Sequence, residues 1–212
     1  MVVEIGSEIR IRDTSKELYD WAQENLIIPN PQYRERERRG LWVGNTPKYL
    51  WLYHVDGSDL IVPTGVGKQI RQFLSDKDQI SVHLADNGVL DYKGTIPLYD
   101  YQKEAVEAMR HASCGILQSP CGSGKTQMGI ALAAMLGRKV LWVTHTQDLL
   151  TQSKTRAEQY FSPEIQGTIT AGKAQVGSHM TFATVQTLCR IDLEQFRYTW
   201  DVVIVDECHR LA

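Results

Sequence analysis

The sequence predicts an α/β fold, in which a parallel sheet carries helices on both faces and a small α+β domain precedes it. Three observations favour this fold. Strand-like and helix-like segments alternate regularly after residue 93, the strand-like segments are rich in β-branched residues, and a glycine-rich turn follows the first of them. Asn87-Gly88, Gly94 and Pro97 interrupt the pattern before that point. We therefore expect two domains, residues 1–92 and 93–212.

The first domain is predicted from short, mixed elements. Asp13 or Ser15 can cap a helix that carries Leu18 and Trp21, and a second helix is expected near 68–74. The predicted strands show alternating or β-branched patterns and lie at 8–12, 49–55, 60–62 and 80–84. These elements suit a small α+β unit.

The second domain has the more regular pattern. Its predicted helices lie at 103–110, 125–136 and 147–160. Its predicted strands lie at 115–118, 139–144, 166–170, 179–183 and 202–205. The last strand consists of four consecutive β-branched residues, which is typical of a central strand buried on both faces.

A phosphate-binding loop is predicted where the first of these strands meets a helix. The pattern G-x-x-x-x-G-K-[ST] is matched up to Lys125 and Thr126, except that Ser119 stands at the first glycine position. Backbone N–H groups in such a loop can point at an anion, and the helix dipole adds positive potential. The residues expected to cradle the phosphates are Pro120, Cys121, Gly122, Ser123 and Gly124. The alternative is an ordinary glycine-rich turn.

Two carboxylates follow the last predicted strand. Parallel strands present their carboxyl ends at a common ligand-binding edge, where Asp206 and Glu207 would emerge. Asp206 can hold Mg²⁺ together with Thr126, Lys125 can reach the β- and γ-phosphates, and Glu207 can orient the attacking water. The alternative is an acidic turn. The two motifs together predict ATP and Mg²⁺ as ligands.

The acidic motif reads Asp206-Glu207-Cys208-His209, and it resembles that of the DExH group of superfamily 2 helicases and translocases. Residues 98–102, 141–146, 168–173 and 181–188 also resemble motifs of this group. The arrangement is most similar to members of the xeroderma pigmentosum group B type and their phage and bacterial relatives. The resemblance implies a RecA-like lobe, an adenine contact by Gln102, coupling through His209, and an accessory role in engaging DNA for residues 1–92. It implies that nucleic-acid phosphates, of DNA rather than RNA, contact Thr144, His145, Gly172, Thr184 and Gln186.

The resemblance further implies a second RecA-like lobe that supplies arginines to the γ-phosphate. The sequence reaches Ala212 soon after His209, so we expect this chain to be the first lobe alone, through design of the fragment. Because such arginines are worth on the order of 10³–10⁵ in rate, we expect Mg·ATP binding with poor hydrolysis.

Composition limits the other classes of function. The net charge of −2 and pI near 6.3 mean that a nucleic-acid surface must be a local patch. No apolar run is long enough to span a membrane, and the acidic start does not resemble a signal peptide, so we expect a cytoplasmic protein. The four cysteines include no C-x-x-C pair, which argues against zinc. Cys121 and Cys208 are expected to be half-buried, although Cys121 could instead be a reactive thiolate.

Two segments of the first domain allow two interpretations. Residues 63–69 contain G-x-G-K after a strand, which indicates either a strand–helix corner or a second phosphate loop. Residues 33–39 alternate in charge, which indicates either a salt-bridged surface or phosphate contact by Arg36, Arg38 and Arg39, helped by Arg34 and Tyr33.

Three further functions remain open. The chain could be part of the translocating subunit of a restriction enzyme, which shares these motifs. It could be a P-loop kinase or ATPase with a substrate other than nucleic acid, or a binding module without catalysis.

Overall fold

The computed structural model describes residues 1–212 except 113, 171 and 211–212. The chain forms two compact units, Met1–Leu84 and Ala85–Ala212. Residues 85–92 belong to the second unit because they pack there. The Asn87 side chain donates to Asp201 at 2.8 Å, and Tyr92 lies in a core cluster with Ile130 and Trp142.

The first unit contains a five-stranded sheet in the order β5-β6-β2-β1-β7. Its strands are β1 (Val2–Ile5), β2 (Glu8–Arg12), β5 (His54–Asp56), β6 (Asp59–Pro63) and β7 (Gln79–Val82). Helix α1 (Lys16–Asn25) packs its buried residues Leu18 and Ala22 into the same core as Val3 and Ile11. The Ser15 hydroxyl accepts from the Leu18 amide at 3.2 Å, which confirms Ser15 as the helix cap.

Two predictions for this unit need correction. The strand expected at 49–55 is two strands in different sheets, because Leu52 and Tyr53 separate β4 (Tyr49–Trp51) from β5. The helix expected at 68–74 is a single turn, α3 (Gly67–Ile70), followed by the 3₁₀ turn Arg71–Phe73. Ile70 is the buried residue of α3, and Phe73 and Leu74 after it pack against the same core without extending the helix.

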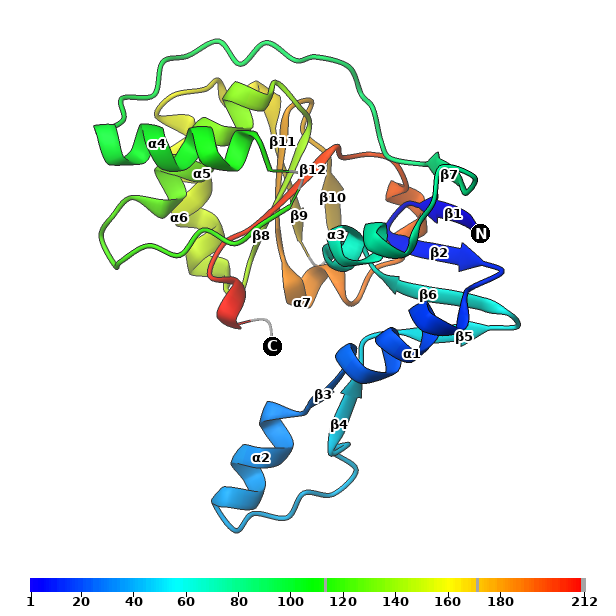
Figure 1. Ribbon diagram of the computed structural model, residues 1–212. Coiled ribbons are helices and arrows are strands. Elements are labelled where there is room, and N and C mark those ends of the chain that lie inside the picture. Colours follow the sequence, from blue (N-terminus) through cyan, green and yellow to red (C-terminus); the bar gives the residue numbers. More distant parts are fainter. Residues whose placement is uncertain (113, 171, 211–212) are drawn as a thin grey trace. The chain divides into compact units, whose positions relative to one another are not determined.

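A protruding arm, defined as residues 27–51, interrupts the first unit (Figure 1). Its base is an antiparallel pair formed by β3 (Ile27–Pro29) and β4. Helix α2 (Pro31–Arg38) follows β3, and an irregular return leads from α2 to β4. Asn30 caps α2 by accepting from the Gln32 amide at 3.0 Å.

The second unit is the predicted parallel sheet, in the order β10-β9-β11-β8-β12. Its strands are β8 (Val140–Thr144), β9 (Gln166–Thr170), β10 (Lys173–Gln175), β11 (Met180–Thr184) and β12 (Val202–Val205). Strands β9, β11, β8 and β12 are parallel, and only the short β10 pairs antiparallel, with β9. The α/β fold class is confirmed.

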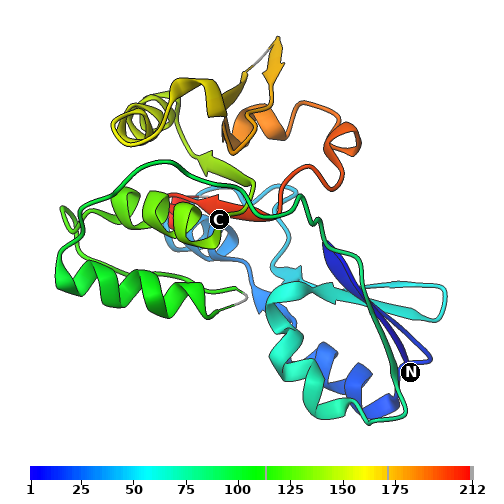
Figure 2. The same cartoon turned by 90° about the horizontal axis from the view of Figure 1, so that it is seen from above.

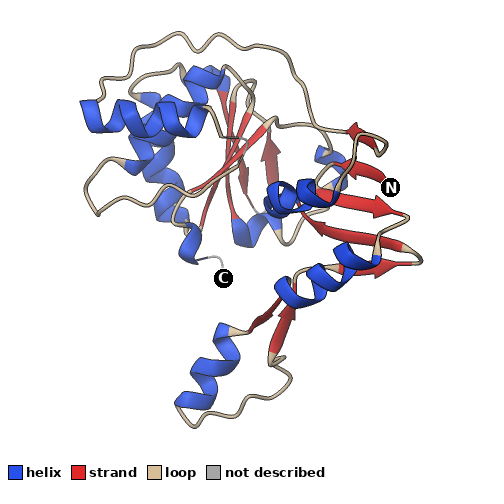
Figure 3. Ribbon diagram, in the orientation of Figure 1, coloured by secondary structure: helices blue, strands red, loops and turns tan. Residues whose placement is uncertain are grey.

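Helices cover both faces of this sheet (Figure 3). On one face, Trp142 and Phe182 are buried against α5 (Lys125–Leu136) and α6 (Gln147–Glu158). On the other, Leu141 and Ile169 pack against the segment that begins with α7 (Val185–Leu188). Helix α4 (Asp100–Arg110) lies beside α5 (Figures 1 and 2). None of the helices in the described part of the chain is long and apolar enough to cross a membrane.

One edge of the sheet differs from the prediction. Gly115–Gln118 forms no strand, and Ile116 is 84% exposed. Strand β12 therefore lies at the edge of the sheet with β8 as its one partner, and Val203 is 59% exposed. The expectation of a central strand buried on both faces was wrong: within the described residues β12 is an edge strand, Val202 and Ile204 pack against the core on one face, and Val203 and Val205 stay exposed on the other.

Gly129 of α5 packs closely against Trp142 of the sheet. A Cβ at this position would lie 2.7 Å from Cη2 of Trp142, which is almost fully buried and cannot move away freely. We expect Gly129→Ala to destabilise the protein by about 1–3 kcal/mol through overpacking, despite the better helix propensity of alanine.

Thermal melting followed by circular dichroism would measure this effect as a Tm lowered by several degrees, at about 2–4 °C per kcal/mol. Gly65→Ala is the matched control, because a Cβ there meets nothing within 4 Å. Equal melting temperatures for Gly129→Ala and the wild type would contradict the prediction.

Candidate active site

The glycine-rich loop leads directly into α5. Gly122 and Gly124 have φ angles of 78° and 81°, a left-handed conformation that favours glycine. The Lys125 ammonium donates to the carbonyl oxygens of Ser119 and Pro120, each at 3.3 Å. Its two acceptors are therefore neutral groups of the loop itself. A phosphate bound at this helix N-terminus would offer Lys125 a stronger, charged acceptor.

The loop is braced from α4. Gln102 is 3% exposed, and its amide nitrogen donates to the Ser123 carbonyl oxygen at 2.8 Å while its amide oxygen accepts from the Tyr99 N–H at 3.0 Å. The Tyr101 hydroxyl donates to the same Ser123 oxygen at 3.0 Å. Gln102 thus holds the loop, and its contact with adenine stays a prediction.

Tyr101 is a site residue that the sequence analysis missed. Its ring stacks beside that of Tyr99, with centroids 5.9 Å apart. The only sequence signal was a second tyrosine directly before Gln102. The contact with Ser123 depends on how α4 packs against the loop, which no local pattern reveals.

Asp206 and Thr126 meet as predicted. Asp206 follows β12, and its carboxylate accepts from the Thr126 hydroxyl at 3.3 Å. Burial raises the pKa of Asp206, and the neighbouring Glu207 raises it further, against weaker lowering by the Thr126 hydrogen bond and by Lys125. The positive charge near this carboxylate does not offset its burial, and a divalent cation bound there would do so.

The described residues contain no cluster of three or more His, Cys, Asp or Glu side chains that could hold a metal by themselves. Mg²⁺ is commonly bound by one or two carboxylates together with substrate phosphates, so Thr126 and Asp206 are the candidates to hold it here. A groove of about 430 Å³ runs beside this point and is lined by both Thr126 and Asp206, with Gln152 and Arg156 from α6.

Glu207 sits in a strained turn. Its φ of 54° is left-handed, which is uncommon for a residue other than glycine and is often found at functional sites. Its carboxylate lies 3.3 Å from Nδ1 of His209. The structure thereby brings these two predicted residues together, directly after Asp206.

The residues predicted to contact nucleic acid follow the carboxyl ends of three parallel strands. Thr144 ends β8, Thr184 ends β11, and Gly172 follows β9, so they share one edge of the sheet. Thr144 and Thr184 are buried, and Thr184 caps α7 by accepting from the Thr187 amide at 3.3 Å. His145 is partly exposed, Gln186 is exposed, and Ala171 beside Gly172 lies outside the described residues. Contact with phosphates stays a prediction for all five.

Two other features of the sequence have clear outcomes. Residues 63–69 form the end of β6, a 3₁₀ turn and α3, and Gly67 has a right-handed φ of −56°, as in a strand–helix corner. All four cysteines are free and exposed. The expectation that Cys121 and Cys208 are half-buried was wrong, because the loop and the turn that carry them lie at the open end of the sheet.

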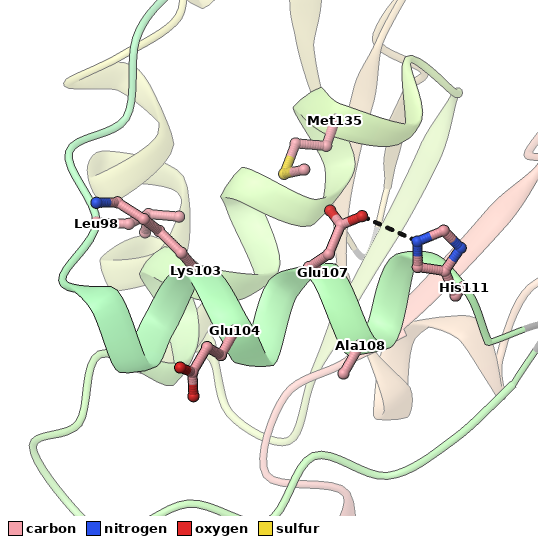
Figure 4. Close-up of a pocket in the computed structure, with 7 residues that line it drawn as sticks. All are labelled: Leu98, Lys103, Glu104, Glu107, Ala108, His111 and Met135. Atoms are coloured by element: carbon pink, nitrogen blue, oxygen red, sulfur yellow. Dashed lines mark hydrogen bonds and ion pairs between the residues drawn. The ribbon is translucent and has the colours of Figure 1, made fainter.

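A larger hollow of about 610 Å³ is lined mainly by residues of α4, with Met135 from α5 (Figure 4). The close-up shows Glu107 directed at His111, with 2.9 Å between their polar atoms. Hydrogen bonds from Arg110 and then His111 lower the pKa of Glu107 to about 2. No predicted site residue lines this hollow, so the smaller groove beside Thr126 and Asp206 is the better candidate.

Comparisons with known proteins show which family and fold the chain resembles. Residues 95–212 match the family model described as "Type III restriction enzyme, res subunit". A stretch of 77 residues is 42% identical to the "DNA 3'-5' translocase XPB2" of Sulfurisphaera tokodaii. That match covers 35% of this chain and 18% of the relative, so the chain spans less than a fifth of the relative's length. The crystal structure of the UvsW helicase from bacteriophage T4 has a similar fold. Its TM-score is 0.65 at 21% identity, over 99% of this chain and 83% of that one.

Proposed function

The chain belongs to the family of the type III restriction enzyme res subunit, and on this basis we propose that it is the ATP-binding part of an ATP-dependent nucleic-acid helicase or translocase. The observation that carries the proposal is the meeting of Thr126 and Asp206, with Lys125 beside them after a glycine-rich loop in which Gly122 and Gly124 have left-handed φ angles. These side chains come from the two motifs that the sequence separates by about 80 residues.

In the proposed mechanism, each group at the site has one task. The backbone N–H groups of the loop and the Lys125 ammonium bind the β- and γ-phosphates. Thr126 and Asp206 would hold Mg²⁺, which supplies positive charge to the phosphate oxygens. Glu207 orients the attacking water and accepts its proton. His209, paired with Glu207, couples the nucleotide state of the site to the second lobe.

Nucleic acid is the proposed partner, and DNA is favoured over RNA because a relative is described as a DNA translocase. The exposed edge that carries His145, Gly172 and Gln186 would contact the phosphate backbone, which makes binding tolerant of sequence and sensitive to salt. A second RecA-like lobe would complete the site.

Steady-state ATP hydrolysis with and without single- and double-stranded DNA tests the need for that lobe. We expect turnover near background, restored by a separately made second lobe. Robust DNA-stimulated turnover by the chain alone would contradict the proposed dependence on a second lobe. Failure of either DNA to alter any nucleotide property would favour a P-loop ATPase or kinase with another substrate.

The Lys125→Ala variant tests the nucleotide site itself. Removing a charge-assisted contact to phosphate costs about 1.5–3 kcal/mol, so we expect Mg·ATP to bind at least roughly 10-fold more weakly. Isothermal titration calorimetry measures the difference directly. Lys103→Ala, which removes an exposed ammonium paired with Asp100 on α4, is the charge control. Unchanged affinity in Lys125→Ala would refute the nucleotide site.

A second candidate, favoured by the description of the matching family, is the translocating subunit of a restriction enzyme. ATP-dependent cleavage of DNA by the full-length protein with its partner subunits would support it. DNA translocation without cleavage would favour the first candidate.

A further inference from the structure

The arm joins the core of its unit at its base, where Ile27 packs against that core. No residue of α2 is buried. The arm is closed at its base by Asn30, which is 5% exposed. The Asn30 side chain donates to the Pro47 carbonyl oxygen at 2.8 Å, and its backbone N–H donates to the Lys48 carbonyl oxygen at 3.0 Å. The arm therefore has a defined conformation, and its surface is open to a partner.

The charge of the arm is opposite to that of the rest of the chain. Residues 27–51 contain five Arg or Lys against two Glu, a net charge of +3, whereas the whole chain carries −2 and the remainder therefore −5. Only Arg39 of these basic residues forms an ion pair within the described structure, with Glu35. Arg34 and Arg38 have no carboxylate partner there, and their spacing of four places them on one side of α2. The salt-bridged surface expected for 33–39 is thus only partly formed.

Large aromatic side chains lie exposed on the return half of the arm. Trp42 is 83% exposed, Trp51 is 64% exposed, and Tyr49 is 47% exposed. The Trp42 ring packs against Gly44, whose left-handed φ is 53° and whose position leaves no room for a Cβ, at 2.7 Å from Cζ3. Arg36 donates to the Trp42 carbonyl oxygen at 3.3 Å. One side of the indole is therefore supported while most of its surface faces solvent.

We propose that the arm is a contact surface for single-stranded nucleic acid, with Arg34 and Arg38 on phosphates and Trp42 stacked on a base. Guanidinium groups and exposed aromatic rings together are what such binding requires, and stacking needs an unpaired base. A protein partner could use the same aromatic residues, but the positive charge favours a polyanion. The inference deepens the proposed function, from which it takes the class of partner.

Fluorescence anisotropy of a labelled oligothymidylate tests the proposal, using the full chain without nucleotide. Base stacking on an aromatic ring is worth about 1–3 kcal/mol, so Trp42→Ala is expected to raise Kd by about 5-fold or more, and Trp42→Phe by less. Arg34→Ala/Arg38→Ala is expected to reduce the slope of log K against log salt by about 1.4, at about 0.7 for each lost phosphate contact.

Two controls remove comparable groups elsewhere. Leu41→Ala removes a neighbouring exposed apolar side chain, and Lys16→Ala/Lys77→Ala removes two exposed charges from the same unit outside the arm. Wild-type affinity in the Trp42→Ala variant, or the same salt slope in both double variants, would overturn the proposal. Equal binding of a duplex, insensitive to Trp42→Ala, would overturn it as well. Because ATP is absent, failure of the nucleotide site in the Lys125 test does not alter these outcomes.

Discussion

Replacing Gly124 by alanine is expected to weaken Mg·ATP binding by at least about 100-fold, through two separate effects. The φ of 81° is strained for any residue with a Cβ, at about 1–2 kcal/mol. The added Cβ would also lie 2.5 Å from the amide nitrogen of Gln102, the atom that holds the Ser123 carbonyl oxygen. The clash therefore displaces the brace that fixes the loop, and the loop N–H groups lose their common direction.

Two neighbouring glycines separate these effects. Gly122 has a φ of 78°, but a Cβ there meets nothing within 4 Å, so Gly122→Ala adds backbone strain alone. Gly115 has neither a left-handed φ nor a close neighbour, so Gly115→Ala is the neutral control. Titration calorimetry should rank the affinities as Gly115→Ala, then Gly122→Ala, then Gly124→Ala. Equal losses at Gly122 and Gly124 would show that the contact with Gln102 does not matter.

The sequence was sufficient for the parts of the site that depend on local chemistry. Gly122 and Gly124 were expected in a phosphate loop because glycine tolerates left-handed backbone, and both have it. Thr126 and Asp206 were expected to meet because the carboxyl ends of parallel strands share an edge, and their side chains are 3.3 Å apart. Such rules need only the order of the elements along the chain.

The errors concern contacts that depend on which elements become neighbours. Val202–Val205 has the composition of a buried strand, yet β12 is an edge strand because Gly115–Gln118 does not pair. Residues 49–55 resemble one strand, yet β4 pairs with β3 in the arm and β5 pairs with β6 in the main sheet. Composition reports whether a segment suits a strand, and it does not identify the partner.

Asp206 shows why the proposed metal site has a cost in stability. Burial disfavours the charged carboxylate, so the pKa of Asp206 in the folded protein lies above its unfolded value. Below the unfolded pKa, near pH 4, the side chain is protonated in both states and the cost vanishes. As the pH rises through the raised pKa of the folded protein, Asp206 becomes a buried carboxylate, which is less stable in the folded protein than in water. The cost is therefore largest near neutral pH.

Asp206→Asn should therefore have opposite effects on stability and on binding. Without ligand, we expect its Tm to exceed that of the wild type near pH 7 and to equal it near pH 4, because asparagine carries no buried charge. With ATP, we expect Mg²⁺ to lose most of its effect on the affinity for ATP, because the amide cannot replace the anionic ligand. Thermal melting and calorimetry measure the two effects.

Asp100→Asn is the control, since Lys103 lowers the pKa of that exposed carboxylate and its removal should not raise the Tm. A lower Tm for Asp206→Asn at neutral pH would show that the Thr126 hydrogen bond outweighs burial, and retained Mg²⁺ dependence would remove Asp206 from the metal site.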